Sequence, residues 1–217
     1  MQDRQQTVNE HIYFLGTGVR MIELGKKQKL LVVKTVDFGI YLGEDRNAPQ
    51  NERVLLPSKQ VPEGTKVGDE IEVFIYKDSQ DRLIATTREP MLQVGQTAVL
   101  KVKQVTRIGA FLDWGLEKDL LLPYHEQTNR VREGEECLVA LYVDKSSRLC
   151  ATMKVYHYLS TRTPYVPGDM VKGRVYEISG NFGVFVAVDD KYSALIPARE
   201  QQASTDRELF LIFVSLR

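Results

Sequence analysis

The sequence predicts an all-β protein built from tandem small closed barrels of five strands each, two complete and a third partial. Three observations predict this fold. A pattern of one large apolar residue, glycine, a small or branched apolar residue, an aromatic and an aliphatic residue occurs three times, around Gly39, Gly109 and Gly183. Val, Ile, Thr, Tyr and Phe are dense between turn residues that recur about every 8–12 positions. No stretch of three turns shows the period of an α-helix.

The composition is that of a globular chain with balanced charge. Hydrophobic residues make up 43% of the 217 positions, which is enough for packed cores and excludes wholesale disorder. The 29 Lys and Arg residues balance 29 Asp and Glu residues, which excludes a strongly basic, histone-like binder but not a local site. No apolar run approaches about 18 residues, and no signal peptide is recognisable. We therefore expect a cytoplasmic protein that does not bind membranes.

Four stretches define the first unit in chain order. Residues 30–42 carry the glycine pattern and predict two strands, and residues 55–57 are a Leu-Leu-Pro step that ends a third. Residues 67–73 open a fourth strand on Val-Gly-Asp and then alternate apolar with polar side chains, as a half-buried strand does. Residues 78–86 form a hairpin that begins with Asp and returns through Arg into a fifth strand. Five short strands in about 65–70 residues fit a small closed barrel, which has no free sheet edges.

The second unit repeats the first at a constant offset, and the third repeats only part of it. Three pairs of equivalent landmarks are each 66 residues apart: Pro57 and Pro123, Gly68 and Gly134, and Ala85 and Ala151. The third unit keeps the glycine pattern and an apolar-apolar-Pro step at 195–197, but lacks the Gly-Asp strand opening and the Asp–Arg hairpin. We expect an incomplete barrel whose open edge is covered by the apolar tail, residues 209–216.

These repeats predict five segments. They are an N-terminal extension that is poorly ordered (1–21), a first barrel domain (22–90), a second barrel domain (91–157), a linker (158–165) and an incomplete third barrel domain (166–217).

The central glycines have a predicted mechanical role. Residues three apart in a regular strand point to opposite faces. A bulge at the glycine adds one residue, so that Phe38 and Tyr41, or Phe182 and Phe185, can share a face. Glycine also lets the barrel coil sharply at that corner.

No group of residues predicts catalysis, a metal site or a cofactor. The histidines His11, His125 and His157 stand apart from Cys or acidic side chains at ligand spacing, and no activated nucleophile or carboxylate pair is recognisable. Cys137 and Cys150 lie on two strands too far along the ladder for a disulfide, so we expect both to be reduced. We expect a protein that is not an enzyme.

The repeated unit resembles the S1-type RNA-binding module, an OB-fold barrel. The glycine patterns, the Leu-Leu-Pro steps, the Val67-Gly68-Asp69 opening and the two Asp–Arg hairpins carry the resemblance. The tandem arrangement, opening at residues 21–26, is similar to the conserved virulence factor B family of bacterial regulators, over about residues 22–200. Members of that family usually continue into a winged-helix domain, so we expect this chain to be a truncated or frame-shifted form, or a fragment.

The resemblance implies an RNA-binding face on each unit. Its residues are Phe38, Tyr41, Asp78, Arg82, Phe111, Asp144, Arg148, Phe182 and Phe185. We expect a basic rim around this face, made of Lys59, Lys101, Lys103, Arg107, His125 and Arg199. The module often carries His at the prolines of the Leu-Leu-Pro steps, so that contact is missing here. Ile108 replaces the first aromatic residue of the second unit, which weakens its stacking platform.

Two functions remain open from the sequence. The first is a post-transcriptional or virulence-type regulator that binds single-stranded RNA through tandem barrels, with DNA as a further possible ligand. The second is a scaffold whose barrels dock a protein partner such as a ribosome-associated factor or RNA polymerase, which the balanced charge favours. The directions of Phe38 and Tyr41 discriminate between them, because rings exposed together favour RNA and buried rings favour the scaffold. The oligomeric state stays open.

Overall fold

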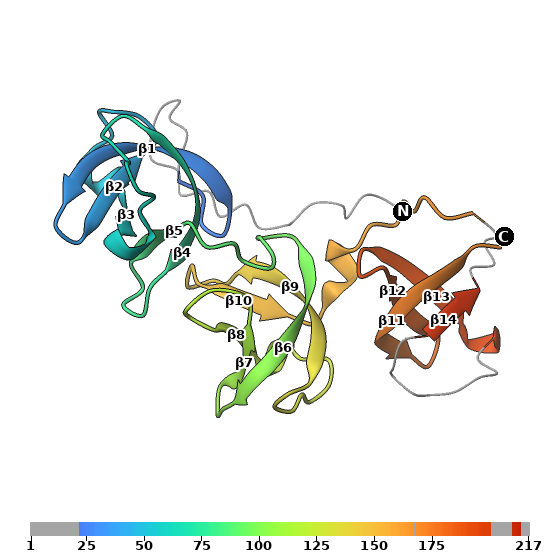
Figure 1. Ribbon diagram of the computed structural model, residues 1–217. Coiled ribbons are helices and arrows are strands. Elements are labelled where there is room, and N and C mark those ends of the chain that lie inside the picture. Colours follow the sequence, from blue (N-terminus) through green and yellow to red (C-terminus); the bar gives the residue numbers. More distant parts are fainter. Residues whose placement is uncertain (1–21, 167, 201–209, 214–217) are drawn as a thin grey trace. The chain divides into compact units, whose positions relative to one another are not determined.

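The structure is a computed structural model that describes residues 22–166, 168–200 and 210–213 (Figure 1). Throughout this part of the chain the regular elements are β-strands and short 3-10 helices, and there is no α-helix. The all-β prediction is therefore confirmed. The extension predicted to be poorly ordered, residues 1–21, lies outside the described residues. None of the described segments forms a helix that is long and apolar enough to cross a membrane.

The first barrel is a closed sheet of five strands. The strands are β1 (Lys27–Val36), β2 (Gly39–Gly43), β3 (Val54–Pro57), β4 (Glu70–Lys77) and β5 (Leu83–Thr86). They are hydrogen-bonded in the order β1-β2-β3-β5-β4, and β4 pairs with β1 to close the barrel. Only β3 and β5 run parallel. Closure pairs both edges of the sheet, which a domain of this size needs to avoid edge-to-edge association.

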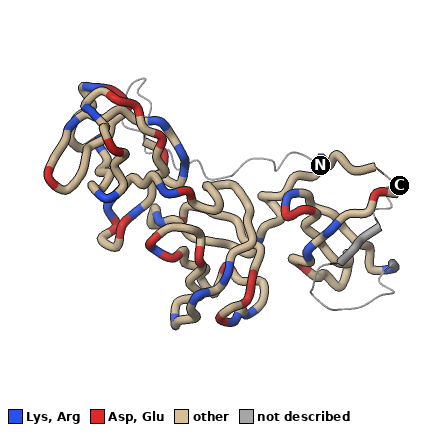
Figure 2. The backbone as a smooth tube through the Cα atoms, viewed as in Figure 1, with Lys and Arg blue, Asp and Glu red and all other residues tan. Residues whose placement is uncertain are grey.

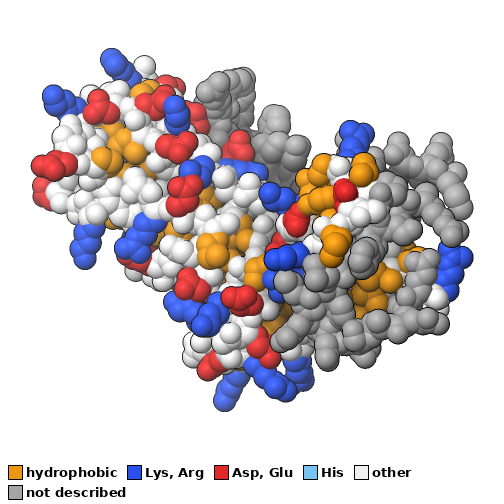
Figure 3. Space-filling model, turned by 45° about the vertical axis from the view of Figure 1, so that its right-hand side comes forward, with side chains coloured by type: hydrophobic (Ala, Val, Ile, Leu, Met, Phe, Trp, Pro, Cys, Tyr) orange, Lys and Arg blue, Asp and Glu red, His pale blue; other side chains and the backbone are white. Residues whose placement is uncertain are grey.

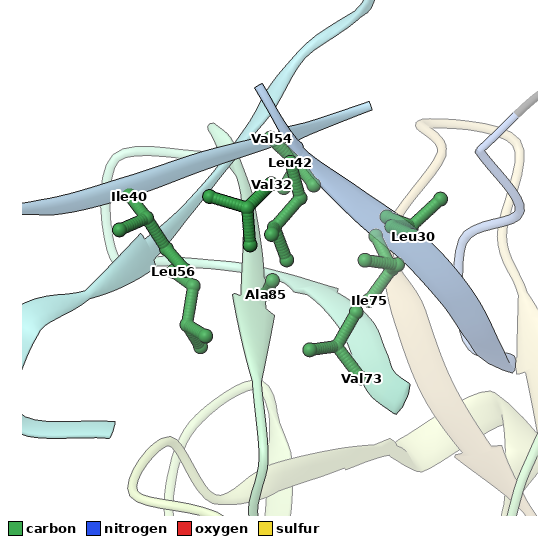
Figure 4. Packing of buried hydrophobic residues seen from close by; sticks show 9 residues of the cluster. All are labelled: Leu30, Val32, Ile40, Leu42, Val54, Leu56, Val73, Ile75 and Ala85. Carbon is green, nitrogen blue, oxygen red and sulfur yellow. The ribbon is translucent and has the colours of Figure 1, made fainter. Parts of the chain in front are cut away.

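Nine aliphatic side chains from all five strands fill the first barrel (Figure 4). They are Leu30, Val32, Ile40, Leu42, Val54, Leu56, Val73, Ile75 and Ala85. Each is at most 3% exposed. Burying one Val, Leu or Ile side chain this completely contributes about 1.5–3 kcal/mol. Because side chains alternate along a strand, this inward set also decides which residues face outward.

A bulge in the first strand sets the outward face of each unit. The register between β1 and β2 shifts so that Val33 is an extra residue in β1. Equivalent shifts make Lys103 and Tyr176 the extra residues in the first strands of the second and third units. The prediction of a bulge at the central glycine is wrong, because the glycine opens the following strand instead. The extra residue belongs to the partner strand, where it increases the local twist.

The central glycine is required because the next strand passes too close for a side chain. Gly39 has a φ of +153° and pairs with Pro57 on β3. A Cβ atom at Gly39 would collide with the carbonyl oxygen of Leu56. Gly109 and Gly183 meet the equivalent carbonyl oxygens in their own sheets. The glycine of the repeated pattern is therefore a backbone requirement at the start of the second strand of each unit.

The second barrel repeats the first. Its strands are β6 (Thr97–Val105), β7 (Gly109–Asp113), β8 (Leu120–Pro123), β9 (Glu136–Val143) and β10 (Leu149–Thr152), closed in the order β10-β8-β7-β6-β9. Cys137 on β9 and Cys150 on β10 are buried and not joined in a disulfide, as predicted. Burial raises the pKa of the Cys137 thiol to about 12, so the thiol is neutral.

The third unit is an open sheet. Its strands β11 (Met170–Ser179), β12 (Gly183–Val188), β13 (Tyr192–Pro197) and β14 (Phe210–Phe213) lie in the order β13-β12-β11-β14. Strand β14 pairs antiparallel with β11, as β4 does with β1. It lies in the tail that we expected to cover this edge; the rest of the tail lies outside the described residues. The described residues supply no fifth strand to this sheet, so the prediction of a partial third unit is confirmed.

The chain divides into two compact units. The first is the first barrel together with residues 115–118 and 142–149, and the second is the rest of the second barrel with the third sheet. Within this second unit, one small buried cluster joins β9, the 3-10 helix η4 (Val155–Tyr158), β11 and β12: Leu138, Ala140, Val155, Leu159, Tyr176 and Ala187. The segment predicted as a linker, residues 158–165, thus begins inside a hydrophobic cluster.

Candidate nucleic-acid interface

Two aromatic side chains lie together on the outside of the first barrel, where β1 turns into β2. Phe38 lies in the turn and is 58% exposed. Tyr41 lies between the buried Ile40 and Leu42 on β2, so its ring points outward and is only partly buried. The ring centroids are 6.4 Å apart and the planes cross at 85°, an edge-to-face contact. An exposed ring held beside a second ring is a surface on which an unpaired base can stack.

The carboxylate of Asp78 organises the β4–β5 hairpin. Its Oδ1 accepts hydrogen bonds from the backbone N–H groups of Gln80 (2.8 Å) and Arg82 (3.0 Å). Its Oδ2 accepts two from the Arg82 guanidinium, at 2.7 and 2.9 Å. Desolvation raises the pKa of Asp78, but the hydrogen bonds from Arg82 and Gln80 outweigh it and hold the pKa below its ordinary value. Asp78 therefore shapes the hairpin, while the mostly exposed Arg82 can reach a phosphate.

The β9–β10 hairpin copies this backbone but uses its arginine differently. Oδ1 of Asp144 accepts hydrogen bonds from the backbone N–H groups of Ser146 (2.8 Å) and Arg148 (2.9 Å). The Arg148 guanidinium instead donates to Oδ2 of Asp81 at 2.7 Å, within the first compact unit. Both side chains are more than 40% exposed. Such an exposed ion pair is worth about 1 kcal/mol at most, so a phosphate can compete for Arg148.

The second and third units carry the aromatic pattern in altered form. Phe111 takes the place of Tyr41 and is partly buried, and Ile108 takes the place of Phe38 and is 60% exposed. In the third sheet Phe182 is 65% exposed. Phe185 is partly buried, with its ring 6.0 Å from Tyr156 and 6.1 Å from the ring of the buried Tyr176. Of these two rings Phe182 is therefore the exposed one, and Phe185 packs against the buried cluster that joins β9, η4, β11 and β12.

Two stretches of the chain match the family model of the S1 domain, residues 24–88 and 94–154. The chain belongs to the S1 domain family. Each matched stretch contains all five strands of one closed barrel, so the S1 domains are the first and second units. The S1 domain is a nucleic-acid-binding OB fold, which places the outward aromatic residues on a barrel of that type.

Two curated bacterial proteins are similar to this chain over much of its length. The chain is 30% identical to the uncharacterized protein YitL of Bacillus subtilis over 190 residues, which are 82% of this chain and 61% of YitL. It is 25% identical over 166 residues to Conserved virulence factor B of Staphylococcus aureus, covering 71% of this chain and 55% of that protein. The predicted resemblance to the conserved virulence factor B family is confirmed. The S1-domain chain spans less than two thirds of the length of either relative.

A solved structure shows the same fold. It is a multidomain protein with nucleic acid binding domains from Streptococcus pneumoniae, with a TM-score of 0.54 and 19% sequence identity. The match covers 86% of this chain and 67% of that chain. At this identity the likeness concerns the fold alone.

The predicted rim residues are exposed, and two of them, Lys103 and His125, lie beside acidic residues. Lys103 donates to Asp119 at 2.8 Å, and this hydrogen bond raises the pKa of Lys103. Nε2 of His125 lies 3.4 Å from a carboxylate oxygen of Glu126. The remaining rim residues, Lys59, Lys101, Arg107 and Arg199, are exposed as well. Basic and acidic residues alternate along both barrels (Figure 2) and lie side by side on the face in Figure 3. The S1 barrels therefore offer separate cations and not a continuous basic groove.

Sequence reasoning missed one aromatic residue at this face. Tyr124 is 45% exposed and follows Pro123 at the end of β8. Its hydroxyl donates to the carbonyl oxygen of Thr106, in the turn between β6 and β7, at 2.6 Å. A comparison of the three repeats singles out Tyr124, because the equivalent positions in the other units hold the small residues Ser58 and Ala198.

Proposed function

We propose that this S1-domain chain binds single-stranded RNA through its outward aromatic side chains and regulates bacterial gene expression after transcription. Phe38 carries the proposal, because its large apolar ring is 58% exposed. Phe182, at the equivalent turn of the third sheet, is 65% exposed. Two Phe side chains that are each more than half exposed at one repeated position point to a role in binding. Stacking of bases provides it, and contributes about 1–3 kcal/mol per base. Of the two rings named in the prediction, Phe38 is exposed and Tyr41 is partly buried, so the support for RNA over the scaffold comes from Phe38.

Charge sets the expected strength of this binding. The three units carry net charges of −1, +1 and −1 over residues 23–89, 91–158 and 165–217. A unit with so little net charge neutralises few phosphates, so its electrostatic contribution to affinity is small. High affinity then requires several units on one RNA strand, because linked sites raise the effective concentration of each other.

In this proposal the chain acts by binding in the cytoplasm and catalyses no reaction. The competing function is a scaffold that binds a protein through the same faces, favoured by the balanced charge. OB folds host both activities, so the fold does not decide between them.

Fluorescence anisotropy with a labelled single-stranded RNA of about 15 nucleotides tests the proposal on the whole chain. We expect saturable binding that weakens with salt. For each phosphate neutralised, the binding constant should fall by about 0.7 log units per ten-fold increase in salt concentration. Single-stranded DNA of the same sequence measures the selectivity for RNA. A folded chain that binds neither nucleic acid at about 50 mM salt contradicts the proposal and leaves the scaffold function.

A further inference from the structure

The three units differ at two positions that are neighbours in space. The first position precedes the central glycine, and the second follows the proline of the apolar-apolar-Pro step. In the first barrel the backbone N–H of Ser58 donates to the carbonyl oxygen of Phe38 at 3.0 Å. In the third sheet the backbone N–H of Ala198 donates to the carbonyl oxygen of Phe182 at 3.2 Å. A side chain at the second position therefore lies beside the exposed aromatic residue at the first.

In the second barrel the aromatic residue stands at the second position instead of the first. The first position is Ile108 and the second is Tyr124. Gly109 pairs with Pro123, which brings the ends of β7 and β8 together as in the other units. The first and third units pair an aromatic with a small residue, and the second barrel pairs an aliphatic with an aromatic. Each unit thus keeps one exposed ring at this corner.

A hydrogen bond from the phenol hydroxyl holds the ring of Tyr124 in place. The hydroxyl donates to the Thr106 carbonyl oxygen at 2.6 Å, while the residue remains 45% exposed. A ring that only filled space would be buried, whereas this ring is fixed in direction and still open to solvent. Holding a side chain in place before binding lowers the entropy lost when a ligand docks on it. The exposed Ile108 adds apolar surface at the same turn.

We propose that Tyr124 is the base-stacking residue of the second S1 domain. It takes over the role that Phe38 and Phe182 have in the other units, where the second domain has Ile108. The inference rests on the proposed RNA-binding function and adds a residue that the repeat pattern does not assign. The ligand is an unpaired RNA base, whose flat face stacks on the phenol ring. The affinity of the second barrel then depends more on Tyr124 than on the partly buried Phe111.

A swap of the two positions tests this inference. Tyr124→Ser installs the residue of the first barrel, and we expect it to weaken binding of a 15-nucleotide RNA by about five-fold or more, the lower limit for one stacked base. Tyr124→Phe keeps the ring and removes only its hydrogen bond to Thr106, so we expect it to weaken binding less than Tyr124→Ser does. Adding Ile108→Phe to Tyr124→Ser returns an aromatic to the position used by the other units, and we expect it to restore most of the affinity.

Three outcomes of this test overturn the inference. If Tyr124→Ser binds RNA as tightly as the unchanged chain while Phe38→Ala binds more weakly, the proposed function stands and the role of Tyr124 is wrong. If Tyr124→Ser weakens binding and the added Ile108→Phe restores nothing, the ring acts only through the fold of the turn. Should the unchanged chain bind no RNA, the proposed function itself fails, and the inference with it.

Cross-linking provides a second measurement that needs no variant. RNA containing 4-thiouridine is irradiated with the unchanged chain, and the tryptic peptides that carry RNA are identified by mass spectrometry. We expect adducts on peptide 119–130, which contains Tyr124, as well as on peptide 35–46, which contains Phe38. Adducts on peptide 35–46 without any on 119–130 contradict the inference even if Tyr124→Ser fails to fold.

Discussion

At the scale of single residues, the Asp of each Asp–Arg hairpin is a structural group. Both oxygens of Asp78 are occupied by hydrogen bonds from its own loop, and Asp144 accepts the same two backbone bonds. These hydrogen bonds show that both carboxylates shape the loops that present Arg82 and Arg148. Their place on an RNA-binding face stays a prediction.

The pH dependence of stability reports this role of Asp78. Its pKa is lowered in the folded state, so its contribution is fully present above the ordinary value of 3.8 and is lost as the pH falls through the folded-state pKa. We expect Asp78→Asn to destabilise the chain by about 1 kcal/mol near pH 7. The difference should shrink below pH 4 in urea unfolding. The exposed Asp37→Asn is the control for loss of a charge, and equal effects of both changes at every pH would speak against the assignment.

The resemblance to the S1 module predicted an outward aromatic pair in the first unit, of which Phe38 is exposed and Tyr41 is partly buried, but not how each ring is used. The packing of Phe185 against Tyr156 and Tyr176 depends on a cluster between β9, η4 and the third sheet, which no local pattern reveals. The exposed Tyr124 was visible only by comparing the three repeats position by position.

At the scale of elements, the central glycine and the bulge solve different problems. The glycine allows the close approach of the next strand, and the bulge one strand earlier sets the twist. The sequence shows a glycine directly, whereas a bulge depends on pairing register between distant segments. This is why the glycine positions were predictable and the bulge at Val33 was not.

Two glycine variants separate backbone strain from close approach. Gly64 has a φ of +80° with open space around it, so Gly64→Ala introduces strain alone, about 1–2 kcal/mol. Gly39→Ala adds a collision with the Leu56 carbonyl oxygen, and we expect a loss of more than about 3 kcal/mol in urea unfolding. Equal losses for the two variants would mean that β2 and β3 can move apart freely.

The pairing of β14 with β11 predicts that the tail stabilises the third sheet. Four residue pairs join these strands, from Met170 with Phe213 to Gly173 with Phe210. Deleting residues 204–217 exposes the edge of β11, and we expect lower solubility and a lower melting temperature. Light scattering and thermal unfolding of the shortened chain measure both. A deletion that changes neither property contradicts the role of β14 as an edge cover.

At the scale of the whole molecule, binding should depend on RNA length more than on charge. One OB fold covers about 4–16 nucleotides, so a strand of about 5 nucleotides engages a single barrel. We expect its affinity to be at least about ten-fold lower than that of a 15-nucleotide strand of the same composition, because linkage between units is lost. Isothermal titration with both RNAs measures the ratio. Equal affinities would show that one barrel does all the binding.

The most direct test of the central claim measures RNA affinity and urea unfolding on the same variants of Phe38 and Tyr41. We expect Phe38→Ala to lose about 1–3 kcal/mol of binding free energy. Its stability should fall by less than the 3–5 kcal/mol typical of a core Phe, for which Phe74→Ala, with a 1% exposed ring, is the reference. Tyr41→Ala should also weaken binding, and Val67→Ala, at an exposed residue that is not part of the aromatic pair, should leave it unchanged. If Phe38→Ala unfolds the chain while its folded fraction binds RNA with full affinity, the aromatic pair is structural and the RNA-binding account is contradicted.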